Sequence, residues 1–313
     1  MTETMPAALI LGYARPAGVV RLVKESVAAG VQKIYVSIDG AVDPKVTKLQ
    51  SQLMRELEVL TDSLSVNIVV WRSSINRGSA GAVVSALDRF FDIEPCGFVL
   101  EDDLSTHPDF FDFCKRALLE YREDERVWIV GGTQIFESQV SEFDLVWTHY
   151  PMIWGWATWA HRWKEIRLAL LAPALAKNSD TSWNTWSYWK LGKQRALRGH
   201  VDAWDLPLAG SMIVLKKLCL LPPVNLVSNL GVDKAATHTS FEEWPLLLPT
   251  HSLTPGRPVR SSVKEMHPVD YDYLLEQNLF RIRKFRLLKL IAGTIMDFFK
   301  KPNRSSLLDR IKT

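Results

Sequence analysis

Three consecutive acids follow a short apolar segment, and their spacing could bind a metal ion. The segment spans residues 97–100, and the acids are Glu101, Asp102 and Asp103. Such a run is typical of a buried parallel strand, whose carboxyl end faces the crevice where open α/β sheets bind ligands. Crowded carboxylates repel one another, so a divalent cation would offset their charge, and oxygen ligands favour Mn²⁺ or Mg²⁺ over zinc. The alternative is a solvated acidic turn that caps the next helix.

Polar residues also follow two other predicted strands. Arg15 comes after the apolar segment 7–13, and Asp39 follows the segment 33–38. At the shared edge of a parallel sheet, an Arg can stack on a base or pair with phosphate, and an Asp can accept from a base N–H or a ribose hydroxyl. The alternative for Asp39 and the glycine after it is a simple turn. The chain has no Gly-x-Gly-x-x-Gly or Walker sequence, which argues against a dinucleotide enzyme or an ATPase.

Arg77 lies just before a segment that predicts a helix starting with small residues. Residues 76–81 read Asn-Arg-Gly-Ser-Ala-Gly. Two glycines allow close approach of a ligand to the backbone, and a helix N-terminus beside an Arg favours an anion. The alternative is an ordinary helix start with a Ser cap.

Aromatic residues are concentrated between positions 147 and 163. Trp154, Gly155 and Trp156 lie at a predicted loop-to-helix junction, where flat aromatic faces beside a glycine suit the apolar side of a sugar ring. A packed loop is the alternative. Trp159 and Trp163 are four residues apart and are expected to share a helix face in the core.

Two acids and a histidine in the second half of the chain are further candidates. Asp202 and Asp205 flank Trp204 and would share one face of a helix. A partly buried Asp can act as a general base, although a helix cap is the more common role of an Asp beside Trp. His238 could bind a metal or a phosphate, and the alternative is an ordinary loop residue.

Strands and helices alternate at short intervals through about residue 132. This alternation predicts an α/β fold with a mostly parallel, doubly wound sheet. The predicted strands are 7–13, 33–40, 66–71, 97–100 and 127–132, and the predicted helices are 16–30, 44–60, 78–91 and 108–121. Further along, connecting helices are expected within 168–200, a short strand at 218–221 and a loop at 224–231.

Composition and charge narrow the class of protein. Of the 313 residues, 47% are hydrophobic and 23% charged, and the net charge of +3 argues against a bulk nucleic-acid binder. Three cysteines without a CxxC motif suit a reducing compartment. The N-terminus lacks the basic start of a signal peptide, and no apolar run reaches the roughly 18 residues of a membrane span. We therefore expect a cytoplasmic protein, soluble or peripheral on the inner face of the membrane.

The C-terminal segment is strongly basic. Residues 279–313 contain ten Lys or Arg and two acids, a net charge of +8, which leaves −5 for the rest of the chain. Apolar residues alternate with the basic ones across predicted helices at 270–301. This combination is typical of helices that touch an anionic membrane surface. The alternative is a helix docked on the body with its basic face in water.

In their order, these motifs resemble the GT-A fold nucleotide-sugar glycosyltransferases, in particular the N-acetylglucosaminyltransferase I-like group and its bacterial sugar-transferase relatives. The resemblance covers about residues 7–240. Its most specific part is Glu101-Asp102-Asp103-Leu104, followed by Pro-Asp-Phe-Phe at 108–111, which is similar to the family's metal motif and the helix after it.

Other parts of the resemblance are individually weaker. Arg15 and Asp39 stand where the family contacts uridine, and residues 154–159 are similar to its Gly-Trp segment before the acceptor region. Trp204-Asp205 stands where the family carries its catalytic Asp, and residues 224–231 and 236–239 are like its closing loop. We expect no N-terminal anchor of the kind that the Golgi members carry, and the residues after Asp205 also differ from theirs.

The resemblance implies a GT-A (Rossmann-like) α/β fold, with a mostly parallel central sheet flanked by helices and a C-terminal helical tail. It implies a glycosyltransferase domain at 1–240, with a nucleotide-binding half to about 132 and an acceptor half from 133. The remaining residues, 241–313, would form a surface-wrapping segment and basic amphipathic helices.

The implied activity is inverting, metal-dependent sugar transfer. The donor would be a nucleotide diphosphate sugar, UDP-linked, and the acceptor a glycan or glycolipid hydroxyl in bacterial surface polysaccharide synthesis. Asp103 would bind Mn²⁺ or Mg²⁺, Glu101 and Asp102 would contact the sugar and ribose, and Asp205 would take the proton from the acceptor hydroxyl.

Two alternatives belong to other functional classes. A sugar-1-phosphate nucleotidyltransferase should show a Gly-rich triphosphate loop after the first strand, and residues 12–16 (Gly-Tyr-Ala-Arg-Pro) are a poor version of one. A non-catalytic carbohydrate-binding protein on the same fold would bind glycan without a metal.

Overall fold

A computed structural model of the chain describes residues 4–173, 175–231, 247–254, 259, 264–282, 284–297, 302 and 305–312. The strands are β1 (Ala7–Gly12), β2 (Lys33–Ile38), β3 (Asn67–Arg72), β4 (Cys96–Glu101), β5 (Leu104–Thr106), β6 (Val127–Gly131), β7 (Leu145–Thr148), β8 (Trp156–Trp159), β9 (Leu218–Leu221), β10 (Val227–Asn229) and β11 (Glu265–Met266). The helices are α1 (Pro16–Ala28), α2 (Pro44–Ser63), α3 (Gly78–Phe91), α4 (Asp109–Glu120), α5 (Glu137–Val140), α6 (Ala160–Leu171), α7 (Trp183–Leu197), α8 (Asp205–Leu215), α9 (Pro268–Leu274), the π-helix η1 (Leu275–Leu279), α10 (Lys284–Asp297) and α11 (Leu307–Lys312).

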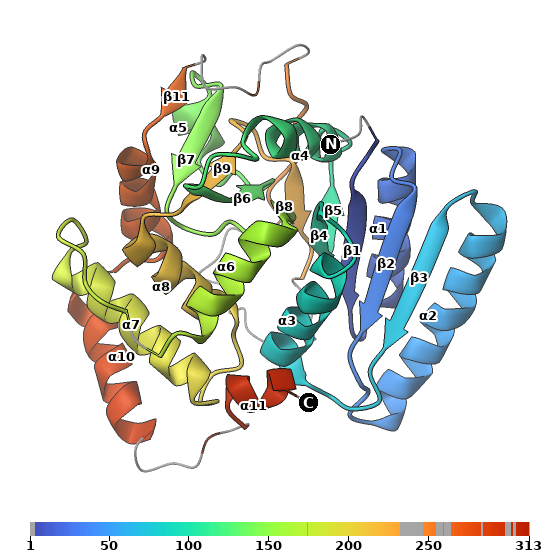
Figure 1. Cartoon of the computed structure of the whole chain (residues 1–313). Helices are drawn as coiled ribbons and strands as arrows, with labels where there is room; N and C mark the ends of the chain where they lie inside the picture. Colours follow the sequence, from blue (N-terminus) through green and yellow to red (C-terminus); the bar gives the residue numbers. More distant parts are fainter. Residues whose placement is uncertain are drawn as a thin grey trace.

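Among the described residues, one nine-stranded sheet runs through the molecule in the order β11-β7-β9-β6-β8-β4-β1-β2-β3 (Figure 1). Strands β3, β2, β1 and β4 are parallel, and Ile10 of β1 lies between Val36 of β2 and Leu100 of β4. Because they are parallel, the carboxyl ends of these strands meet at one edge. A separate antiparallel pair joins β5 to β10. The predicted fold class, an α/β fold with a mostly parallel central sheet flanked by helices and a helical C-terminal tail, is confirmed.

Helices cover both faces of the sheet, because side chains alternate between its faces along each strand. Leu9 and Leu11 pack in one apolar cluster with residues of α3, α6 and α8. Ala8 and Ile10 pack in the other cluster with residues of α1, α2 and α4. Continuous apolar strands such as β1 and β4 are thus explained by burial on both sides.

The expectation for residues 154–163 is wrong in one respect. Trp159 does not share a helix with Trp163, because Trp156–Trp159 forms β8, which is antiparallel to both β4 and β6 and lies between them. Both indole rings are buried as expected, with Trp159 inside the sheet and Trp163 on α6. β8 thus joins the parallel half of the sheet to the half built from β6, β9 and β7.

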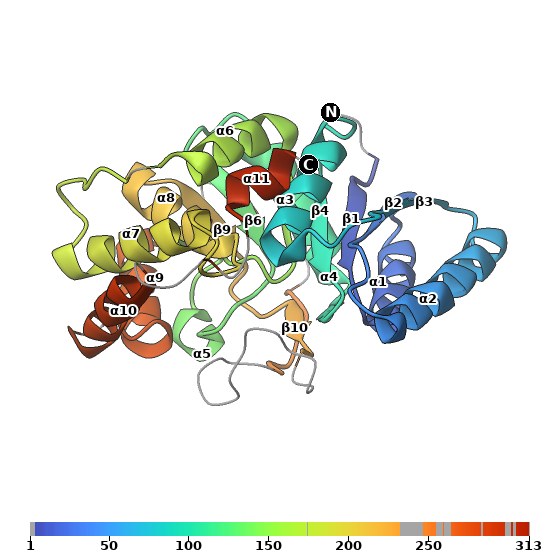
Figure 2. The same ribbon diagram turned by 90° about the horizontal axis from the view of Figure 1, so that it is seen from below.

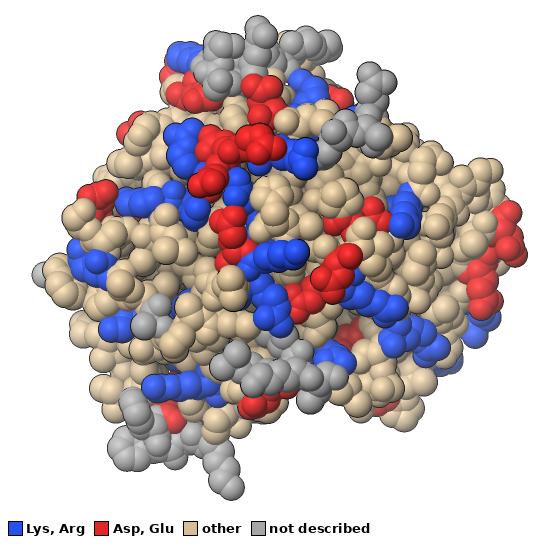
Figure 3. Space-filling view, viewed as in Figure 1, with Lys and Arg blue, Asp and Glu red and all other residues tan. Residues whose placement is uncertain are grey.

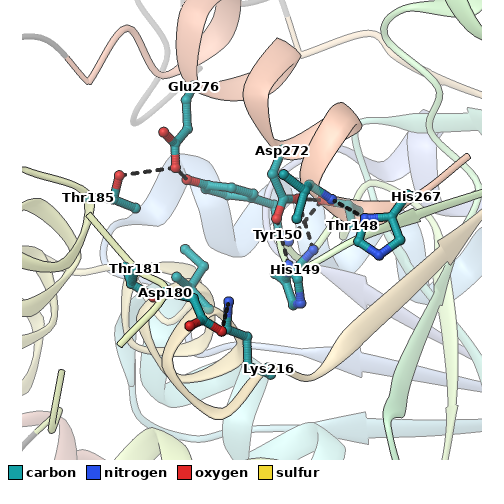
Figure 4. A network of polar contacts seen from close by, with 12 residues as sticks. Thr148, His149, Tyr150, Asp180, Thr181, Thr185, Lys216, His267, Asp272 and Glu276 are labelled. Atoms are coloured by element: carbon teal, nitrogen blue, oxygen red, sulfur yellow. Dashed lines mark hydrogen bonds and ion pairs between the residues drawn. The ribbon is translucent and has the colours of Figure 1, made fainter. Parts of the chain in front are cut away.

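A buried polar cluster fastens the C-terminal segment to the sheet (Figure 4). Asp272 on α9 accepts hydrogen bonds from the hydroxyl of Thr148 at 2.6 Å and the backbone N–H of His149 at 3.0 Å, and it pairs with the His149 ring at 2.6 Å. Glu276 accepts from the hydroxyl of Tyr150 at 2.8 Å. Since β11 also pairs with β7, part of the segment expected to wrap the surface extends the sheet.

The end of the chain returns to α3, where α11 lies beside that helix (Figures 1 and 2). Leu307 of α11 is fully buried in the apolar cluster on the α3 face of the sheet. Within the described residues, none of the helices has the length and apolar character needed to cross a membrane.

Lys193 of α7 is a buried cation between α6 and α8. Its side chain is 1% exposed, and its Nζ donates to the Ala169 carbonyl at 2.6 Å and the Ser211 hydroxyl at 3.1 Å. Burial lowers the pKa of Lys193 from 10.5 to about 8. Hydrogen bonds to these two oxygens therefore do not fully replace the water lost by the ammonium group.

We predict that the free energy of unfolding rises between pH 8 and pH 10.5, because in this window the unfolded chain keeps the proton that folded Lys193 has released. The gain is on the order of 3 kcal/mol and is absent in Lys193→Met. Urea denaturation of both proteins across this pH range measures it. Parallel pH profiles for the two proteins would show that Lys193 does not titrate in this way.

Candidate active site

The ends of β1 and β4 meet through hydrogen bonds to Asp102. Its carboxylate accepts from the backbone N–H of Tyr13 at 2.9 Å and from Nη1 of Arg15 at 3.2 Å. The same Arg15 nitrogen lies 3.7 Å from the carboxylate of Asp103. Gly18 of α1 packs against this turn so closely that a Cβ would lie 1.8 Å from the Asp102 carbonyl oxygen. The predicted convergence of Arg15 with the acids after β4 is therefore present.

The carboxyl groups at this edge strongly affect one another. Burial raises the pKa of Glu101 to about 8, and neighbouring carboxylates add to the effect. Those carboxylates belong to Asp103, Asp102 and Asp205, whereas Arg15 acts in the opposite direction. Burial also raises the pKa of Asp102 to about 6, against the hydrogen bond from Tyr13. The acids after β4 therefore affect one another's pKa as expected from the sequence, and Asp205 of α8 also acts on Glu101.

Asp103 lies under the loop that follows β10. Its carbonyl accepts from the backbone N–H of Leu230 at 2.7 Å, and its side chain is 24% exposed. A Cβ on Gly231 would lie 2.7 Å from Oδ2 of Asp103, so glycine leaves room beside this carboxylate. The residues expected to close over the site therefore include a segment that touches the proposed metal ligand directly.

Asp39 holds the N-terminus of α3. Its buried carboxylate accepts from Nδ2 of Asn76 at 3.0 Å and from the backbone N–H groups of Arg77 at 2.9 Å and Gly78 at 3.2 Å. The helix N-terminus that was expected to favour an anion is thus engaged by the chain's own carboxylate. Gln50 of α2 ties this corner to β1, because its Nε2 donates to the carbonyls of Asp39 at 2.8 Å and Tyr13 at 3.1 Å.

The two candidate acids around Trp204 have different surroundings. Asp202 accepts from the backbone N–H groups of Ser79 and Ala80, both at 3.1 Å, and it forms an ion pair with Arg310 of α11. Asp202 therefore helps to cap α3. Asp205 begins α8, is exposed, and is one of the acids that raise the pKa of Glu101. They do not share a helix face as expected, because α8 begins after Asp202.

The Trp-Gly-Trp segment is mostly structural. Trp156 is 1% exposed and stacks on Trp204 with ring centroids 5.8 Å apart, so its expected contact with a sugar ring is not available in this structure. Gly155 has φ +65°, and a Cβ would lie 2.7 Å from Val227, so both conformation and space require glycine. Trp154 is partly exposed, and its carbonyl accepts from Thr133 at 2.6 Å.

The donor set at the β4 edge fits a hard divalent cation that a substrate helps to bind. Within the part of the chain that the structure describes, no three His, Cys, Asp or Glu side chains are arranged to hold a metal ion by themselves. Mg²⁺ and similar ions are commonly bound through one or two carboxylates plus substrate phosphates. Burial and the neighbouring carboxylates together raise the pKa of Glu101, and a bound ion would favour its charged form. The other proposed ligand, His238, lies outside the described residues.

Two supporting residues were missed from the sequence. Gln50 occupies the buried face of α2, in step with Val46, Leu53 and Leu57, and is 4% exposed. A polar residue at an apolar position of a helical period was the available signal. Nothing local marks Arg310, whose partner Asp202 is more than one hundred residues away.

No protein-family model and no curated protein matches the chain. Similar solved structures include HddC from Yersinia pseudotuberculosis (12% identity, 50% of this chain and 78% of that one, TM-score 0.33). Another is mannose-1-phosphate geranyltransferase from Thermus thermophilus, at 11% identity over 70% of this chain and 74% of that one, with a TM-score of 0.34. A third is a putative glucose-1-phosphate thymidylyltransferase from Bacillus anthracis in complex with a sucrose, at 10% identity over 51% of this chain and 74% of that one, with a TM-score of 0.33. TM-scores this low assign no activity.

We predict that Gly231→Ala weakens Mn²⁺-dependent nucleotide binding at least several-fold, because the added methyl would lie 2.7 Å from Asp103 Oδ2 and 2.9 Å from Asn229 Oδ1. Calorimetric titration of UDP in the presence of Mn²⁺ measures this. Gly192→Ala is the matched control, since its Cβ would make only ordinary contacts at 3.7 to 3.9 Å. Equal UDP affinity in the two variants would show that the loop at Gly231 is not part of the nucleotide site.

Proposed function

We propose that the protein is a metal-dependent glycosyltransferase that uses a nucleotide diphosphate sugar, UDP-linked, as donor. One observation supports this proposal: Asp205 directly follows Trp204, which stacks on Trp156 of β8, and Trp156 pairs with Val99, two residues before Glu101 in β4. We infer that a site for a charged leaving group and a site for a base lie near each other at this edge. This arrangement is what transfer to an acceptor hydroxyl requires.

Asp103 is the residue proposed to hold Mn²⁺ or Mg²⁺ together with the donor's diphosphate. When bound, the ion would supply charge neutralisation at the leaving diphosphate. Asp102 is less suited to direct binding, because Tyr13 and Arg15 already occupy its carboxylate. We propose that Asp102 orients Arg15, while Glu101 contacts the donor sugar or ribose.

Asp205 is the proposed general base. It is exposed at the first residue of α8. Trp204 is held by stacking on buried Trp156, which fixes the start of this helix. In the proposed reaction, Asp205 takes the proton of the acceptor hydroxyl as that oxygen attacks the anomeric carbon, and the nucleotide diphosphate leaves from the opposite face.

Arg77 is proposed to lie at the nucleoside end of the donor site. Asp39, whose carboxylate is taken up by the start of α3, is proposed to hold Arg77 in place through the hydrogen bond at 2.9 Å rather than to contact the nucleoside. Trp154 is proposed to face the acceptor, a glycan or lipid-linked sugar of bacterial surface polysaccharide synthesis.

A thermal-shift screen of nucleotide sugars with and without Mn²⁺, followed by mass spectrometry of products, tests the proposal. Glycosyl transfer predicts stabilisation by one nucleotide sugar only with metal, and release of its nucleoside diphosphate. A second arm supplies nucleoside triphosphate and sugar 1-phosphate, and pyrophosphate release there would assign nucleotidyl transfer instead. Glycan binding without metal or turnover would indicate a carbohydrate-binding protein.

We predict that Asp103→Ala abolishes transfer and weakens Mn²⁺-dependent UDP binding at least tenfold (about 1.4 kcal/mol), because the proposed ion loses its protein ligand. Product assays and calorimetry measure the two effects. If wild-type protein binds UDP equally well with Mn²⁺ and with a chelator, Asp103 has no metal role.

We predict that Asp205→Asn keeps UDP affinity but lowers transfer by roughly 10² to 10⁴-fold, the usual contribution of a positioned base. Asp202→Asn is the comparison, because Asp202 caps α3 and its loss should lower the melting temperature rather than remove the base. Near-normal turnover in Asp205→Asn would exclude this residue as the base.

A further inference from the structure

The helix α10 carries its apolar side chains on the outside. Leu288, Ile291, Ile295 and Met296 are 61%, 36%, 53% and 54% exposed, and Ala292 between them is exposed as well. Spacings of three and four residues place all five on one side of the helix. We call this row the α10 stripe. Scattered exposed apolar residues are ordinary, but a continuous row along a helix marks an interaction surface.

The opposite side of α10 packs against α7, and it is the more polar one. Asp297 accepts from Nε of Arg195 at 2.6 Å, and a Cβ on Gly293 would lie 3.4 Å from Nη1 of the same arginine. Asp297 also lies 3.9 Å from Nδ1 of His200. A surface helix in water normally turns its apolar side inward. In α10 the described apolar side chains face outward instead, and none of the described segments covers them.

The segment that carries the stripe is basic in sequence. The segment 279–313 has a net charge of +8, while the preceding residues sum to −5. A cavity of about 220 Å³ between α7 and α10 is lined by Arg195, Arg198 and His200, and Asp297 is the single acid among its described lining residues. In Figure 3 Lys and Arg side chains are interspersed with Asp and Glu across the centre of the face shown.

We propose that the α10 stripe lies in the surface of an anionic membrane, with Arg198 at the rim of the neighbouring cavity facing the lipid phosphates. Apolar residues next to a basic segment are the combination that binds such surfaces. A second copy of the chain is the less suitable occupant, because two segments of +8 would repel each other. This proposal does not depend on the reaction catalysed.

Flotation of the full chain with phospholipid vesicles tests the proposal. We expect the protein to float with vesicles of equal parts phosphatidylglycerol and phosphatidylcholine, and to remain behind with phosphatidylcholine alone. The double variant Leu288→Ser, Ile295→Ser should bind the anionic vesicles at least about tenfold more weakly. Arg198→Gln should also weaken binding, with the stripe intact.

The matched control is Val59→Ser, Leu168→Ser, which removes two exposed apolar side chains from α2 and α6 and should bind like wild type. The melting temperatures of the two double variants are compared first, and equal values show that a difference in vesicle binding does not come from unfolding. Anionic-vesicle binding that survives the stripe variant would overturn the proposal. So would a wild-type dimer in sedimentation that the stripe variant loses, because the stripe would then be a contact between copies.

Discussion

The burial of crowded carboxylates at the end of β4 is the constraint on which the rest of the site depends. Glu101 ends this buried strand, Asp102 and Asp103 follow it, and Asp205 of α8 also acts on the pKa of Glu101. Left alone, this arrangement favours protonation, as the raised pKa of Glu101 indicates. Arg15 offsets part of the repulsion among these acids, and a bound cation would offset more of it. We therefore interpret these carboxylates as a cation-binding site rather than as residues with a purely structural role.

The surroundings position this cluster by contacts between distant parts of the chain. Carboxylates from Asp39 and Asp202 hold successive N–H groups at the start of α3, and Arg310 of α11 joins Asp202 from the far end of the sequence. Because Asp202 lies two residues before Trp204, the same contacts fix the approach to α8. The first residue of α8 is thereby placed relative to both halves of the sheet.

The parts of the fold that follow local periodicity could be predicted from sequence. Helix α3 was predicted with its observed bounds, and β9 likewise, because small residues, apolar spacing and turn signals agree there. Strand β8 was missed, since four residues with two tryptophans fit a helix start equally well and only the sheet itself shows the gap they fill. The different roles of Asp202 and Asp205 depend on α3, which no local pattern could reveal.

We propose that these carboxylates form an incomplete cation site that a nucleotide diphosphate completes. Electron paramagnetic resonance of free Mn²⁺, recorded on wild-type protein with and without UDP, measures this completion. We expect weak Mn²⁺ uptake by the protein alone and at least about tenfold tighter uptake when UDP is present. Mn²⁺ uptake that UDP does not change, after correction for Mn²⁺ binding to free UDP, would contradict it.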